Sequence, residues 1–342
     1  MRRSKLWLGA TLVALSLVAA ACGGGGEGGN DPGGQTDLTG SIFISGSSTV
    51  EPISALVAEL FNEENPGVAI NVEGPGTGDG FELFCNGETD VSDASRPIDP
   101  EEEVAACEAN GVEYIELEVA IDGMAVLTSM ENTAVECLNF ADLYALLGPE
   151  SQGFGSWSDA NTLGEELGGG AVPYPDADLV VTAPGEESGT YDSFIELALA
   201  DIAEERGQPD DQTRPDYQAS GNDNVIVEGI AGSPSSLGWV GYAFFVQNQD
   251  VVRAIPVAEG TGTECVSPDE GTISGGEYPL QRSLYIYVNA GKAAESEALT
   301  AFVDFYMTST SLQDAVSQVG YVTLPTDRQE ASASTWEAEK PA

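Results

Sequence analysis

The pattern of apolar and polar residues predicts short strands separated by amphipathic helices. Apolar residues recur at helical spacing between residues 53 and 61 and again between residues 194 and 202. Short apolar runs typical of strands lie at 41–44, 68–72, 90–92, 114–119, 124–128, 179–182, 237–242 and 284–288. Strands that alternate with helices indicate an α/β protein with parallel sheets. Ligands of such sheets bind at the loops where strands end and helices begin.

The N-terminus has the pattern of an export signal. Arg2, Arg3 and Lys5 precede an apolar run that ends in small residues before Cys22. This order resembles a bacterial lipobox, which implies that residues 1–21 are a lipoprotein signal peptide and that Cys22 is lipidated. The alternative is an ordinary secretory signal in which Cys22 has no role. With a lipidated Cys22, the mature protein would be extracytoplasmic and lipid-anchored to the cell membrane.

Two further segments lack a periodic apolar pattern. Residues 22–40 are rich in Gly and predict a flexible tether between the anchor and the domain. Residues 331–342 are polar and predict a flexible tail.

Composition removes several classes of function. The chain has 342 residues, 57 Asp and Glu against 11 Lys and Arg, a net charge of −46 and no histidine. Histidine-dependent catalytic groups and histidine-ligated zinc are therefore absent. The acidity disfavours nucleic-acid binding, which needs a basic surface. We expect no cofactor, no metal site and no enzymatic activity. A hydrolase of phosphate esters is the alternative from another class, but no histidine could activate its serines.

Four cysteines remain after Cys22. An even number in an exported protein indicates two disulfides, and four cysteines permit three pairings. Proximity along the chain favours Cys85–Cys107, which leaves Cys137–Cys265. A metal site is disfavoured because no Cys-x-x-Cys spacing occurs.

Three loops share features that suit an anion. Gly46–Val50 links a strand to a helix, and Ser48 with Glu51 fits a capping box. A helix start offers unpaired N–H groups and hydroxyls, which bind anions. Ser188-Gly189-Thr190 repeats this arrangement, and Gly74–Gly80 is a third loop with exposed backbone.

Arg96 adds a cation to these loops. Its planar guanidinium can bind two oxygens of one oxyanion. The alternative is an arginine in a structural ion pair. Because the chain has so few cations, we favour the oxyanion interpretation.

Together these loops resemble the phosphate-binding component of bacterial phosphate ABC importers. The similarity is carried by Gly46–Val50, Gly74–Gly80, Ala94–Pro97, Ile121–Val126, Glu187–Thr190, Leu237–Tyr242 and Tyr278–Leu280. It implies a two-lobed periplasmic-binding-protein fold of type II, with a hinge and a ligand cleft between the lobes. Lobe 1 would comprise residues 41–120 plus about 270–330, and lobe 2 about 121–269. A monomer of this kind would capture inorganic phosphate and deliver it to ABC permease subunits.

The resemblance also implies site residues. Phosphate oxygens would be bound by Ser48, Thr49, the Val50 amide, Thr77, Ser188, Gly189 and Thr190. The chain departs from the family where Arg96 and Pro184 replace an Asp and an Arg that many members have, so Arg96 would supply the countercharge.

The acceptor of the phosphate proton is left open by this departure. Asp122 is the candidate, with Glu187 and Asp223 as alternatives, and a hinge or capping role is the other interpretation of Asp122. Another oxyanion, such as sulfate, molybdate or a phosphonate, is the alternative ligand.

Overall fold

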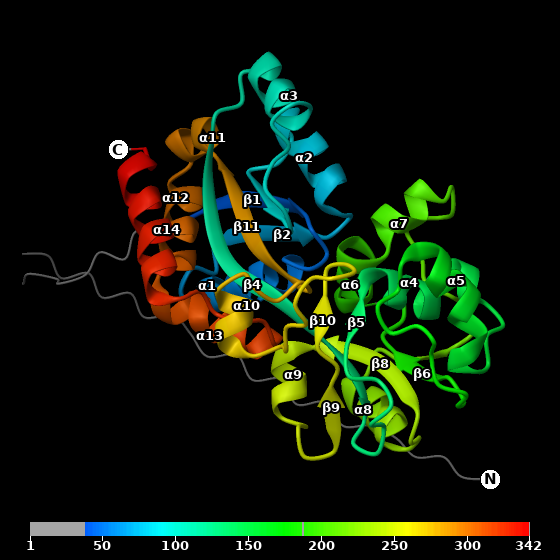
Figure 1. The fold of residues 1–342 in the computed structure, drawn as a ribbon. Helices are drawn as coiled ribbons and strands as arrows, with labels where there is room; N and C mark the ends of the chain where they lie inside the picture. The colour runs from blue at the N-terminus through cyan, green and yellow to red at the C-terminus, as the bar shows by residue number, and fades with distance from the viewer. Residues whose placement is uncertain (1–37, 187, 342) are drawn as a thin grey trace, which may run out of the picture. The chain divides into compact units, whose positions relative to one another are not determined.

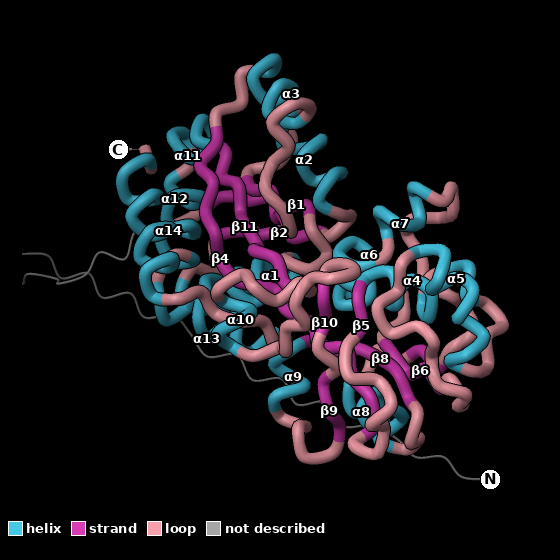
Figure 2. Tube along the Cα trace, viewed as in Figure 1, coloured by secondary structure: helices cyan, strands magenta, loops and turns pink. Residues whose placement is uncertain are grey.

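The computed structural model describes residues 38–341 apart from Glu187, and one mixed sheet runs through them (Figures 1 and 2). Its strands, in spatial order, are β2 (Val68–Glu73), β1 (Gly40–Gly46), β3 (Val91–Ala94), β11 (Gln281–Asn289), β4 (Tyr114–Ser129), β8 (Ser236–Gly241), β6 (Val180–Ala183) and β7 (Gln218–Ala219). A further strand, β9 (Val252–Ala254), pairs with β4, and β5 (Leu138–Asn139) pairs with β10 (Val257–Ala258).

The predicted parallel pairing holds for the outer parts of the sheet and is wrong for its centre. β1 is parallel to β2 and β3, and β6 is parallel to β7 and β8. In contrast, β11 is antiparallel to β3 and β4, and β4 is antiparallel to β8 and β9. The difference arises because β11 comes late in the chain and enters the sheet between β3 and β4 in the opposite direction.

β4 is one strand of 16 residues where the sequence predicts two. Residues 114–123 pair with β11, and residues 124–129 pair with β8 and β9. The polar Asp122 and Gly123 interrupt the apolar pattern, which is why the sequence divides the strand there. The structure instead buries Asp122 within a continuous strand, at the point where the strand changes partners.

Buried apolar side chains form four clusters in the described part of the chain. Two draw on residues 42–120 and 284–336, and two on residues 121–280 with Val322 and Leu324. We call the first set lobe 1 and the second set lobe 2. In lobe 1, Leu284 and Ile286 of β11 pack in one cluster and Tyr287 in another, because alternate side chains face opposite sides of a strand. Helices therefore cover both faces of this part of the sheet (Figure 1).

The helices of lobe 1 are α1 (Glu51–Glu64), α2 (Thr77–Cys85), α3 (Glu103–Asn110), α11 (Ala290–Glu295), α12 (Glu297–Tyr306), α13 (Ser309–Val319) and α14 (Thr326–Glu339). Lobe 2 contains α4 (Phe140–Leu147), α5 (Asn161–Leu167), α6 (Gly189–Ala198), α7 (Ala200–Glu205), α8 (Asp223–Ala231), α9 (Tyr242–Val246) and α10 (Glu270–Ser274), with short 3-10 turns at Pro149–Ser151 and Trp157–Ala160. No helix within residues 38–341 is both long and apolar enough to cross a membrane.

Both predicted disulfides are present. Cys85–Cys107 joins α2 to α3, and Cys137–Cys265 closes a long loop within lobe 2. Their separations along the chain are 22 and 128 residues. A crosslink over such spans restricts the unfolded chain, with stabilisation typically about 2–4 kcal/mol.

The C-terminal segment differs from the flexible tail expected over residues 331–342. Residues 326–339 form α14, and the Trp336 side chain is buried in the lobe 1 core. The Trp336 indole N–H donates to Asp304 at 2.7 Å. A single buried aromatic residue gives no helical repeat, so the sequence pattern did not reveal this contact. The predicted signal peptide, Cys22 and residues 22–37 of the tether lie outside the described residues.

Candidate functional site

The starts of α1 and α6 meet between the two lobes. Ser48, in the loop between β1 and α1, donates its hydroxyl hydrogen to Asp192 Oδ2 of α6 at 2.9 Å. Beside it, Thr49 Oγ1 lies 3.2 Å from Ser193 Oγ. Gly189 permits this approach, since a Cβ there would lie 3.3 Å from the Ser48 carbonyl oxygen. The predicted Ser48 and Thr49 therefore contact α6, but through Asp192 and Ser193, which were not predicted.

The predicted capping box at α1 does not form. The helix begins at Glu51 with Val50 as its N-cap, and no side chain caps it. The Ser47 carbonyl accepts from the Val50 amide at 3.1 Å, so this predicted phosphate donor closes a turn. Ser47 Oγ accepts from the Thr49 amide. The turn is closed without the Ser48 hydroxyl, which contacts lobe 2 instead.

The cation at this contact is Arg282, which sequence reasoning missed. Arg282 of β11 is paired in register with Asp122 of β4, and their side chains are 10% and 2% exposed. The guanidinium donates to Thr49 Oγ1 at 3.0 Å and to Ser193 Oγ at 2.6 Å. It also forms an ion pair with Glu196 of α6. Arg282 thus contacts both lobes at once.

Asp122 and Arg282 keep unused hydrogen-bonding capacity. Arg282 Nε and Asp122 Oδ2 are 3.5 Å apart, and both atoms are buried without a hydrogen-bond partner. Buried polar groups are nearly always partnered, so an unpartnered donor and acceptor side by side suit a bound polar ligand. The signal that could have found Arg282 was a cation at the start of a strand next to Tyr278–Leu280.

Burial changes the proton affinity of the carboxyl groups at the contact. Burial raises the pKa of Asp122, and the Arg282 charge and Ser193 act in the opposite direction. Burial also raises the pKa of Asp192, with Ser48 opposing the rise and Glu196 adding to it. One guanidinium therefore faces three carboxyl groups, two of which hold a proton more readily than in water.

Thr77 and Arg96 lie in a neighbouring cavity. Thr77 Oγ1 is 2.9 Å from Ser95 Oγ, and the Thr77 backbone begins α2. The Arg96 guanidinium donates to both carboxylate oxygens of Glu103, at 2.9 and 2.7 Å. Its side chain is 46% exposed and is engaged in the ion pair that was the alternative interpretation.

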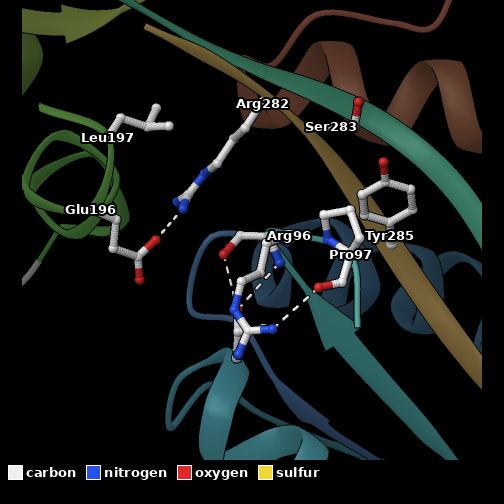
Figure 3. A pocket seen from close by; sticks show the side chains of 9 residues that line it. Arg96, Pro97, Glu196, Leu197, Arg282, Ser283 and Tyr285 are labelled. Atoms are coloured by element: carbon white, nitrogen blue, oxygen red, sulfur yellow. Dashed lines mark hydrogen bonds and ion pairs between the residues drawn. The ribbon is translucent and has the colours of Figure 1, made fainter. Parts of the chain in front are cut away.

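Arg96 and Arg282 line the same cavity, which has a volume of about 510 Å³. Figure 3 shows Arg282 extending from β11 toward Glu196, with Arg96 below it. The cavity therefore adjoins the contact between α1 and α6.

The other predicted residues of lobe 2 are Ser188, Asp223 and Glu187. Ser188 is the N-cap of α6, and its hydroxyl accepts from the Thr190 amide at 3.3 Å. Asp223 begins α8, where burial raises its pKa. Glu187 lies outside the described residues. Among the residues that are described, no group of three or more acidic or Cys side chains is placed to hold a metal ion.

Comparison with known proteins gives consistent results. A family model described as a PBP superfamily domain matches residues 32–310. Protein SphX of Synechocystis sp. is 36% identical over 287 residues, which cover 83% of this chain and 79% of that protein. Phosphate-binding protein PstS of Staphylococcus haemolyticus is 32% identical over 325 residues, or 94% and 93% of the two chains.

Solved structures agree with this fold. A possible phosphate binding protein from Planctomyces limnophilus superposes with a TM-score of 0.78 at 34% identity, covering 88% of this chain and 99% of that one. PstS from Borrelia burgdorferi gives a TM-score of 0.58 at 23% identity, covering 84% of this chain and 99% of that one, and supports the fold alone. The predicted fold is confirmed.

Proposed function

The chain belongs to the PBP superfamily, and we propose that it captures inorganic phosphate between its lobes and delivers it to an ABC-type membrane permease. Relatives that bear the name phosphate-binding protein, at 32% identity and over nearly their full length, support this ligand. The arginine, carboxyl and hydroxyl groups at the contact between the lobes are independent support for this ligand.

One observation carries the proposal: Arg282 Nε and Asp122 Oδ2 form a buried ion pair at 3.5 Å in which neither atom has a hydrogen-bond partner, next to the hydroxyls of Thr49 and Ser193. Phosphate at neutral pH offers oxygens that accept from a guanidinium and from hydroxyls, and it retains a proton that a carboxylate can accept. A fully ionised oxyanion would leave the buried carboxylate unpaired, which is costly.

The roles of individual residues follow from this arrangement. Arg282 would supply the positive charge, and Ser48 and Thr49 would donate hydroxyl hydrogens from lobe 1. The amide of Gly189, at the start of α6, would donate from lobe 2, whereas the Thr190 amide already donates to Ser188. Asp122 would accept the phosphate proton. The bound ion would then hold the lobes together, because it contacts both.

Calorimetric titration of the purified, ligand-stripped protein tests this function. We expect inorganic phosphate to release or absorb measurable heat and to raise the melting temperature, while sulfate at the same concentration has a much weaker effect. Tight binding of sulfate, molybdate or a phosphonate in place of phosphate would identify another oxyanion as the ligand. An absence of any response to phosphate would contradict the proposal.

We also propose that the protein acts at the membrane as an extracytoplasmic monomer anchored through a lipid on Cys22. The support is the N-terminal pattern of residues 1–22 together with the export-compatible disulfides. A Cys22→Ser variant should move from the membrane fraction to the soluble fraction, as measured by fractionation and immunoblotting. Continued membrane association of this variant would contradict the anchor.

A further inference from the structure

The carboxyl group of Asp192 takes its hydrogen bond from a residue that the ligand also needs. Ser48 donates to Asp192 Oδ2 at 2.9 Å, and no other residue in the described part of the chain donates to this carboxyl group. Ser48 is also a proposed phosphate donor, and its hydroxyl has one hydrogen to give. When that hydrogen turns to phosphate, Asp192 loses its donor and needs another beside the bound ion.

A P–OH group of the phosphate itself is the donor that can replace Ser48. In the proposed site, Asp122 already accepts one phosphate proton through its buried Oδ2. Burial raises the pKa of both Asp122 and Asp192, and the Arg282 charge opposes the rise in both, so both carboxyl groups lie near this cation. An ion bound at Arg282 therefore has two carboxyl acceptors beside it, and each suits one proton.

The charges around the site favour a ligand with as little negative charge as possible. Ser48 lines a cavity of about 440 Å³ whose charged lining residues, among those described, are all acidic, namely Asp192, Glu196, Asp210 and Asp211. Arg282 is paired with both Asp122 and Glu196, so it leaves no excess of positive charge. The carboxylates repel dibasic phosphate, which carries two charges, more strongly than monobasic phosphate, which carries one.

We propose that the protein binds phosphate as the monobasic ion, H2PO4⁻, with one P–OH donating to Asp122 and the other to Asp192. Arg282 and the Thr49 hydroxyl then donate to the two oxygens that carry no hydrogen. The inference rests on the proposed function, because it takes the contact between the lobes as the phosphate site. It makes Asp192 a second residue that determines which form of the ion is bound.

The proposal requires a proton from solvent when the pH is high. A phosphate group loses its second proton near neutral pH, so dibasic phosphate, HPO4²⁻, predominates above it. Binding there combines HPO4²⁻ with one proton to give bound H2PO4⁻. The affinity for total phosphate should therefore fall with rising pH, and protons should be taken up in proportion to the phosphate bound.

Other titratable groups near Asp192 define the background of this measurement. From the elements around it, they are Glu51 of α1, Asp122 of β4, Arg282 of β11, Glu196 of α6, Asp210 and Asp211 after α7, and Tyr321 after α13. Burial raises the pKa of Tyr321, so its phenol stays protonated. Asp93, with a pKa raised by burial to about 7, titrates in this range but lies next to the Ser47 turn. Its contribution is common to the wild type and to Asp192 variants, so the difference between them isolates Asp192.

The test is calorimetric titration of the full protein with inorganic phosphate at pH 6 and pH 8.5, in two buffers of different ionisation enthalpy. At pH 8.5 the wild type should take up about one proton per phosphate, and its affinity for total phosphate should fall by about tenfold per pH unit above neutrality. The Asn side chain of Asp192→Asn can also donate, so this variant should accept dibasic phosphate. Its proton uptake at pH 8.5 should be much smaller, while its affinity at pH 6 stays within about tenfold of the wild type. Asp211→Asn removes the same charge from the same cavity, and this matched control should keep the wild-type uptake.

The outcomes separate this inference from the proposed function. If the wild type binds phosphate without proton uptake at pH 8.5, the inference is wrong and the function stands. If Asp192→Asn keeps the wild-type uptake, or if Asp211→Asn loses it equally, the inference is overturned as well. Should Asp192→Asn fail to fold, Asp192→Ser, which has a hydroxyl in place of the carboxyl group, takes its place in the same comparison. If the wild type binds phosphate at neither pH, the proposed function itself fails.

Discussion

The two lobes bring opposite chemistry to the surface where they meet. Lobe 1 contributes hydroxyls from Ser48 and Thr49, and β11 adds the Arg282 guanidinium. Lobe 2 contributes α6, whose Asp192 and Glu196 face those donors one helical turn apart. Closing the lobes therefore sets two carboxyl groups of lobe 2 against the hydroxyls and the cation of lobe 1.

This difference shows what kind of anion the contact can accept. The carboxyl groups of Asp192 and Glu196 already use the donors that an anion needs, and the buried Asp122 adds a third. A ligand without a proton would meet three acceptors and one cation. A ligand that retains a proton can donate to a carboxylate and accept from Arg282, so protonated phosphate is matched to both lobes.

Removing the cation should have the largest effect on this arrangement. We expect Arg282→Gln to weaken phosphate binding by about a thousandfold, since removing one partner of a buried charge pair between protein and ligand costs roughly 2–5 kcal/mol of binding free energy. Calorimetry measures the change, with Lys340→Gln, which removes a cation paired with Asp304 and Glu337, as the control. Arg282→Lys keeps the charge without the planar guanidinium, so its phosphate affinity should lie between those of the wild type and Arg282→Gln. An Arg282→Gln protein with intact affinity would exclude Arg282 from the site.

Lobe 1 also has a buried carboxyl group, which offers the next largest effect. Asp93 lies in β3 and pairs in register with Gly46 at the end of β1, next to the Ser47 turn. Its Oδ1 accepts a hydrogen bond from Ser54 at 2.8 Å, and its buried Oδ2 has no hydrogen-bond partner. Burial raises the pKa of Asp93 to about 7, with the Ser54 hydrogen bond opposing the rise and Glu51 adding to it. Between the unfolded pKa of 3.8 and about 7, the native state binds more protons than the unfolded state.

The free energy of unfolding should therefore fall as the pH rises through this window and level off above it. Relative to Asp93→Asn, the wild type should lose about 3 kcal/mol between pH 5 and pH 8. Urea unfolding at several pH values measures this difference. The exposed Asp314→Asn variant is the control and should follow the wild type. Parallel curves for wild type and Asp93→Asn would show that Asp93 titrates normally.

Local patterns in the sequence predicted the parts of the fold that depend on neighbouring residues. The helix after Ser48, most of the strands and the helix start at Ser188 follow from apolar spacing and from small residues near turns. The pairing of Cys85 with Cys107 follows from proximity. Each of these depends on a short stretch of chain, so one sequence suffices to predict it.

Contacts between distant segments could not be predicted in the same way. Arg282 reaches Asp122 because β11 enters the sheet beside β4 in a fixed register, across 160 residues of sequence. Asp192 and Glu196 matter because α6 approaches α1, and no local pattern specifies that approach. Arg96 had the favourable local context but found Glu103 as its partner. Residue type thus indicated the chemistry, whereas sheet order determined which arginine lies beside Asp122.

Replacing Asp122, the proposed acceptor of the phosphate proton, should have a smaller effect, which is on the ratio of phosphate to sulfate affinity. Asp122→Asn replaces the acceptor with a group that can also donate, so sulfate is no longer penalised. We expect the ratio of phosphate to sulfate affinity to fall by about tenfold, as for the loss of one buried hydrogen bond. Competition titration measures the ratio. Asp223→Asn, at one of the two alternative acceptors, should leave the ratio unchanged, and the reverse result would assign the proton to Asp223.

Removing the Glu196 carboxylate, which competes with phosphate for Arg282, should have the smallest effect on phosphate affinity, and it should raise the affinity instead of lowering it. Glu196 pairs with Arg282, and its side chain is 51% exposed, so it competes with the ligand through a partly solvated ion pair. Such pairs contribute at most about 1 kcal/mol, which limits the gain from Glu196→Gln to about fivefold tighter phosphate binding. Glu103→Gln is the control, because it also removes a carboxylate from an arginine ion pair, that of Arg96, and we expect it to leave inorganic phosphate binding unchanged. Weaker binding by Glu196→Gln would mean that lobe 2 holds the ligand through this carboxyl group instead of competing with it.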